Sequence, residues 1–480
     1  MKYVYCFMMF LYCNQLKGQI LFEEGGLFKE NTSFYEIGSL FLIDEKEIKD
    51  STVVLGKSFY GKNNVKHAFI PTSYEGILLA SEGIKKVEGM LFYGKIKFKE
   101  QYNNATLGKN TFESFYQSPY YLTDTIQKQW KLQQVKAETL VSNGTDKKLH
   151  TTLKFTYHVQ HKVNNQFPKA LLYKNSLAVS PSFGYKFNKK HRLVFKYNYQ
   201  NNTKEITIDG GTIAQSRIFS ITGVGNLANN KGLGSNYRFE KEISNEIGLQ
   251  GAFKLARNTL LKYQFSLEQM KQRGFDDALK QVQVFDYDEW ITKGAIYFKK
   301  ESFLNIFYMS YGIFYQDGKG RHMKPRINNT FTEKLFQKIK VSLYQKEQAT
   351  LFTASINHTH KQEVNTIYAN LYDIDYIEMV GSYKKQFFIK RGCLSFLVGV
   401  GYQTSTFVKN RFVKENVYIK RYLLPYLQFY NQDFYYINFL PKFKFPIKSM
   451  KSSITIGIHT NLTMVNHVNF YNALFLKANF

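Results

Sequence analysis

Histidines are the residues of this chain whose type and spacing come nearest to a reaction centre. His358 and His360 are separated by one residue, and His158 and His161 form a second close pair. Residues two apart on a β-strand share a face, so His358 and His360 are placed acceptably for metal binding. Glu363 is the nearby acidic residue that could complete such a set. The pattern favours histidines of a wall or rim over a metal centre.

Motifs with a defined catalytic spacing are absent from the sequence. It contains no GxSxG elbow, no HExxH helix and no phosphate-cradling glycine loop. Cys393 is the single cysteine beyond residue 13, which excludes an internal disulfide or a cysteine zinc site in that part of the chain. We therefore predict no enzymatic activity and no cofactor. A hydrolase whose Ser/His or Asp/His site follows no sequence motif remains an open alternative.

The chain is strongly basic. Its 480 residues include 65 Lys and Arg against 37 Asp and Glu, a formal charge of +28. The basic residues occur singly among aromatic and β-branched residues, whereas nucleic-acid-binding surfaces gather them in blocks or on helices. The pattern therefore predicts no nucleic-acid partner. Two explanations remain: cations that line an aqueous interior, or cations at a membrane rim that meet lipid phosphates.

Alternating side chains predict that β-strands hold these cations. Leu153, Phe155 and Val159 alternate with Lys154 and His158, and comparable period-2 stretches recur along the chain. No stretch beyond the amino terminus has the roughly 20 apolar residues of a membrane-spanning helix. Strands that are apolar on one face and polar on the other are typical of a transmembrane β-barrel. We predict an all-β, antiparallel transmembrane barrel of about 16–18 strands.

The carboxyl-terminal residues predict the strand that closes the barrel. Apolar side chains fall on one face of this strand at Phe470, Leu474, Leu476 and Phe480. A closing strand is required because lipid satisfies no free backbone groups at a sheet edge.

Three regions are predicted along the chain. Residues 1–19 have a basic start at Lys2 and a short apolar core, as in an export signal peptide. Residues 20–73 lack sustained alternation and are assigned to an amino-terminal periplasmic segment. Residues 74–480 are assigned to the barrel. The predicted location is the outer membrane of a Gram-negative cell.

The predicted inner face of the barrel is basic. A charged side chain facing hydrocarbon at mid-depth costs roughly 2–4 kcal/mol, so lysines on the polar face of a strand are expected to point inward. The residues assigned to this lining are Lys95, Lys97, Lys99, Lys154, Lys186, Arg192 and Lys196. Such a lumen would favour anions. The alternative is that some of these side chains lie at the rims and bind lipid phosphates.

Several short motifs resemble a family of uncharacterised outer-membrane β-barrel proteins of Bacteroidota. The motifs are Tyr74-Glu75-Gly76, Phe92-Tyr93-Gly94-Lys95, Ser118-Pro119-Tyr120-Tyr121 with Leu122 and Asp124, Val179-Ser180-Pro181 and Phe183-Gly184-Tyr185. They lie in the first half of the chain. The resemblance implies a large barrel that often accompanies TonB-dependent uptake systems, and it supplies no catalytic residues.

The leading functional hypothesis is a channel, or an accessory component, for uptake of solutes across the outer membrane. The alternative is a plugged structural barrel that docks surface lipoproteins or secretion components. Expected partners are outer-membrane lipid and lipopolysaccharide, the barrel-assembly machinery, and a TonB-dependent receptor or a surface lipoprotein.

Overall fold

A single antiparallel sheet accounts for most of the described chain. The computed structural model describes residues 50–62, 71–110, 120–143, 148–166, 169–188, 190–209, 218–222, 227–229, 235–276, 282–323, 327–367, 369–389, 392–413, 419–447, 452–464 and 468–479. The wall strands are β1 (Ser51–Lys62), β2 (Ser73–Val87), β3 (Met90–Asn110), β4 (Tyr120–Ser142), β5 (Leu149–Asn164), β6 (Lys169–Lys186), β7 (His191–Asp209), β10 (Ser235–Ala256), β11 (Thr259–Phe275), β12 (Gln283–Glu301), β13 (Asn305–His322), β14 (Ile327–Gln345), β15 (Thr350–Asn365), β16 (Asn370–Ile389), β17 (Gly392–Arg411), β18 (Phe434–Ile447), β19 (Ser452–Met464) and β20 (Val468–Asn479).

Two smaller features lie between wall strands. β8 (Ile218–Thr222) and β9 (Leu227–Asn229) form a short hairpin after β7, and β8 pairs with the first residues of β4. After β17, a π-helical turn (η6, Ile419–Leu423) leads into the helix α2 (Leu424–Tyr430). Within the described ranges, no helix has both the length and the apolar character needed to span a membrane.

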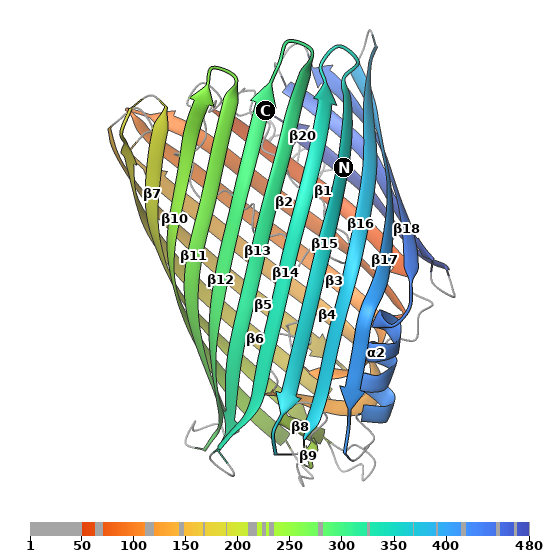
Figure 1. Cartoon of the computed structure of the whole chain (residues 1–480). Helices are drawn as coiled ribbons and strands as arrows, with labels where there is room; N and C mark the ends of the chain where they lie inside the picture. The colour runs from red at the N-terminus through yellow and green to blue at the C-terminus, as the bar shows by residue number, and fades with distance from the viewer. Residues whose placement is uncertain are drawn as a thin grey trace, which may run out of the picture.

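The sheet closes on itself. β7 pairs with β10, so the β8–β9 hairpin stands outside the ring of wall strands. β1 pairs antiparallel with β2 on one side and with β20 on the other, where Val53 lies opposite Asn479. Eighteen antiparallel strands thus form a closed barrel (Figure 1). This confirms the predicted fold and its upper strand count, and it leaves no wall edge for lipid.

The boundary predicted between a periplasmic segment (20–73) and the barrel (74–480) is wrong in one respect. β1 is a wall strand, so the barrel already includes Ser51–Lys62. Its alternation is weak: Val53, Leu55 and Phe59 face inward and are buried, while the exposed outward positions carry both Ser58 and Tyr60. The predicted signal peptide, residues 1–19, lies outside the described residues.

Side chains alternate between an apolar outer surface and a more polar interior. On β5, the outward Leu153, Phe155 and Tyr157 are 39%, 43% and 49% exposed, whereas the inward Thr152 is 7% exposed. On β16, the outward positions between Asp375 and Lys385 carry Ile377, Met379, Gly381 and Tyr383. Ten residues at about 3.3 Å each, tilted by about 40°, cover about 25 Å of height, which matches the apolar band of outer-membrane barrels. The wall is therefore a membrane-spanning surface.

The two ends of the barrel differ. Tight turns such as Glu88-Gly89, where both φ angles are positive (47° and 78°), connect the strands at one end, and Asn479 also lies there. The β8–β9 hairpin and α2 lie toward the other end, drawn at the bottom of Figure 1. Outer-membrane barrels have short periplasmic turns and longer external loops. The hairpin and α2 therefore belong to the extracellular side.

Candidate functional site

The inner wall of β3–β7 gathers the basic residues singled out in the sequence. Lys95, Lys97 and Lys99 on β3 alternate with the exposed, outward Phe92 and Ile96. The other predicted lining residues also lie on the inner face, because the exposed apolar residues of their strands occupy the alternate positions. These residues are Lys154 on β5, Lys186 on β6, and Arg192 and Lys196 on β7. All of these side chains lie on the strand face that points away from lipid.

Strand register adds five lysines that the sequence did not single out. They are Lys128 and Lys136 on β4, Lys162 on β5, Lys174 on β6 and Lys204 on β7. Each has the parity of an inward residue, because its sequence neighbours carry the outward side chains. The alternation of outward and inward side chains around the apolar Val135 on β4 could have identified Lys136 as an inward residue from the sequence.

A few carboxylates neutralise part of this charge. The Lys95 ammonium lies 3.7 Å from Glu82 on β2, and the Lys196 ammonium lies 3.6 Å from Glu246 on β10. The Glu138 carboxylate forms ion pairs with two lysine ammonium groups, Lys136 at 2.6 Å and Lys154 at 3.4 Å. Among the described inward side chains of β3–β7 themselves, Glu138 is the one carboxylate. The net charge of this wall is therefore strongly positive.

Like charges face one another directly across neighbouring strands of this wall. Lys97 lies opposite Lys136. Lys174 lies opposite Lys204, whose ammonium also lies 3.3 Å from the Glu242 carboxylate of β10. Directly opposed like charges in a sheet destabilise the pairing. A bound or passing anion would relieve that repulsion, so the Lys97–Lys136 pair is a favourable place for one.

The rest of the inner wall is mixed in charge. Inward carboxylates occur on β10–β12, at Glu240, Glu242, Glu246, Glu268 and Glu289, together with cations such as Lys293. Glu268 holds the Lys293 ammonium at 2.6 Å. Further inward lysines lie on β14 and β15, at Lys334, Lys338, Lys340 and Lys361, but β3–β7 carry the largest excess of inward cations over carboxylates.

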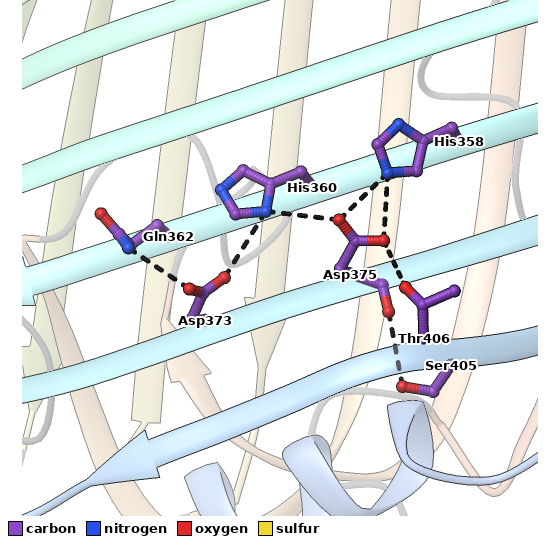
Figure 2. A network of polar contacts seen from close by, with 7 residues as sticks. All are labelled: His358, His360, Gln362, Asp373, Asp375, Ser405 and Thr406. Carbon is purple, nitrogen blue, oxygen red and sulfur yellow. Dashed lines mark hydrogen bonds and ion pairs between the residues drawn. The ribbon is translucent and has the colours of Figure 1, made fainter.

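The histidine pair at 358 and 360 lies on the outer face. Figure 2 shows both rings beside Asp373 and Asp375 of the neighbouring strand β16. His358 Nε2 is 3.0 Å from each carboxylate oxygen of Asp375, and His360 Nδ1 is 3.5 Å from Asp373 Oδ1. Glu363, the acidic residue near them in sequence, has inward parity and lies on the opposite face. The sequence missed the two aspartates because only strand register brings them to the histidines.

This outer network lacks the arrangement of a reaction centre. No group of three or more metal-binding side chains with suitable geometry occurs among the described residues. The Ser405 hydroxyl donates to the Asp375 carbonyl oxygen at 3.4 Å, and the Thr406 hydroxyl donates to the Asp375 carboxylate. In a Ser/His/Asp triad the nucleophilic hydroxyl donates to the histidine, whereas these two hydroxyls donate to Asp375. Asp375 marks the outer edge of the apolar band, so the network belongs to the polar belt above the hydrocarbon.

The other residues that the sequence analysis named belong to strands of the barrel wall where the structure describes them. His158 faces inward, whereas His161 faces outward and stacks on Tyr173 at 4.7 Å between ring centroids, so the two histidines do not share a site. Cys393 is a free, half-buried residue of β17. In the terminal strand, Leu474 and Leu476 are exposed outward and the backbone of Phe470 pairs with β1. Phe480 lies outside the described residues.

Comparisons with known proteins identify a family and several barrels of low similarity. Residues 42–475 match "Family of unknown function (DUF6850)". No curated protein matches. The alcaligin outer-membrane receptor FauA of Bordetella pertussis has a TM-score of 0.47 at 7% identity, over 90% of this chain and 76% of that one. The ferric preacinetobactin receptor BauA of Acinetobacter baumannii has a TM-score of 0.43 at 8% identity, over 90% and 80%.

Proposed function

This chain belongs to a family of unknown function, DUF6850, and from its inner wall we propose that it is an outer-membrane channel for uptake of small anionic solutes. The observation that carries the proposal is the basic inner surface of β3–β7, where Glu138 is the one described inward carboxylate. Charged side chains that line a pore set its ion preference. Barrels of 16–18 strands are wide enough to leave an aqueous channel.

The placement of charge supports passage through the lumen over binding of lipid phosphates at a rim. Lys97 directly follows the exposed Ile96 on β3, and Lys136 directly follows the exposed Val135 on β4. Both lysines therefore lie at the depth of the hydrocarbon. A lipid phosphate lies outside that depth. The lysines can thus act on a solute inside the barrel. Lipid and lipopolysaccharide are expected to contact the outer polar belt instead.

Reversal potential in a planar bilayer tests this function. With a KCl gradient across the purified protein, we expect stable conductance steps and a reversal potential of the sign set by chloride, because the inner wall repels potassium. A reversal potential of the sign set by potassium would contradict the proposal. Complete electrical silence would favour the alternative, a plugged barrel that docks a lipoprotein or a TonB-dependent receptor.

A further inference from the structure

The segment between β17 and β18 is amphipathic and well packed. Ile419, Leu423 and Leu427 recur every four residues and are 0%, 0% and 2% exposed. Lys420 and Gln428 lie on the other side and are exposed. One face of η6 and α2 is therefore covered by protein, while the opposite face remains open to solvent.

The contacts of its last residue place this segment on the inner side of the wall. The Tyr430 ring lies 5.3 Å from the Tyr376 ring, and the Lys361 ammonium lies 5.6 Å from the Tyr430 ring centroid. Tyr376 and Lys361 both have inward parity, because the exposed Met379 and Ile356 of the same strands face outward. A side chain that reaches both must come from inside the barrel. α2 also contacts β16 and β17.

The segment 419–430 faces the basic inner wall of β3–β7 across the interior of the barrel. β16 and β5 are separated by the same number of strands in both directions around the ring, so β16 lies opposite the centre of β3–β7. The depths also agree. Tyr376 adjoins Asp375 at the outer edge of the apolar band, and Lys99 adjoins Glu100, which forms an outward ion pair with Lys131 at 3.4 Å. The end of the helix, at Tyr430, and the last of the three β3 lysines, Lys99, therefore lie at the same depth in the membrane.

We infer that residues 419–430 are a constriction element that narrows the lumen at the level of Lys99 and sets the size limit for anions. This deepens the proposed function and rests on it for the charge of the solute. The narrowing itself follows from the position of the segment. Lys420 on its exposed face adds a cation to the side of the lumen opposite the basic inner wall of β3–β7.

A same-length linker replacement tests the inference. Exchanging residues 419–430 for a Gly/Ser linker is expected to raise single-channel conductance about twofold or more, since conduction depends on the narrowest part of a pore. In proteoliposome swelling with neutral sugars of increasing size, larger sugars should enter. The matched control exchanges residues 218–229, the β8–β9 hairpin, for the same linker and should leave both readouts unchanged.

The outcomes separate this inference from the proposed function. Neutral sugars report size alone, so swelling tests the constriction whatever the charge preference proves to be. Unchanged conductance and an unchanged sugar limit in a folded linker variant would overturn the inference. A milder variant, Tyr430→Ala, should raise the size limit partially by releasing the helix end from Tyr376, and no change there would also count against it. If the wild-type protein shows no preference for anions in the reversal-potential measurement, the proposed function is overturned instead.

Discussion

Replacing Lys97, Lys136 and Lys174 together by glutamate lowers the anion-to-cation permeability ratio by at least about tenfold. A unit charge about 8 Å from a permeating ion acts on it with roughly 0.5 kcal/mol in water. Each Lys→Glu exchange changes the local charge by two units and acts oppositely on cations. Screening at 0.1 M salt removes about half of this effect. About 1 kcal/mol per substitution remains, and the reversal potential measures the sum.

A charge-matched control separates the inner wall from net charge. Lys169, Lys241 and Lys319 have outward parity on β6, β10 and β13 and are exposed. Converting these three to glutamate lowers the net charge of the protein equally without touching the inner face. We expect the control to keep the anion preference of the wild type. Equal changes in both triple variants would show that the β3–β7 wall does not set selectivity.

Deleting residues 51–62 reduces the yield of folded barrel to less than about a tenth of the wild type. Without β1, both β2 and β20 lose a hydrogen-bonded neighbour along most of their length. Each backbone group left unpaired in hydrocarbon costs several kcal/mol. β2 and β20 are both antiparallel to β1, so they could close the gap only by pairing parallel to one another. Heat-modifiable migration on gels and circular dichroism of the refolded protein measure the yield.

The β8–β9 hairpin supplies the control for this deletion. Removing residues 218–229 takes out the same length of chain, but β7 still pairs with β10 and the ring remains closed. This variant should fold with a yield close to that of the wild type. Efficient folding of the 51–62 deletion would mean that β1 is dispensable and that the barrel closes in another register.

Regular alternation explains why much of the wall was predictable. Phe155 and Lys154 are adjacent in sequence, and a period of two forces them to opposite faces. Once one face is known to meet lipid, the other is assigned, which is how the inward positions of Lys154 and Lys196 follow from their neighbours. Proline has no backbone N–H to donate, so it fits a strand only at an irregularity. Accordingly, Pro181 lies where the β6–β7 register skips from the Val179 pair to the Ser182 pair.

Features that depend on tertiary packing were not predictable in the same way. The inward face of β1 is mostly apolar, and its Leu55 packs against Ala80 and Leu440. Recognition of a wall strand depends on a polar inner face, which this strand largely lacks. The aspartates beside His358 and His360 come from another strand, and their pairing requires the β15–β16 register. The helical segment 419–430 carries a four-residue apolar repeat, but its inner location depends on the contact of Tyr430 with Tyr376.

Residue-by-residue spin labelling along β3 tests the assignment of lipid and water faces most directly. Single cysteines at positions 91–99, in a background without the three native cysteines, carry a nitroxide in the reconstituted protein. Collisions with lipid-soluble oxygen should dominate at the even positions, which include Phe92 and Ile96. Collisions with a water-soluble nickel chelate should dominate at the odd positions, which include Lys95 and Lys97. Equal accessibility at neighbouring positions, or the reverse alternation, would contradict the placement of the lysines inside the barrel.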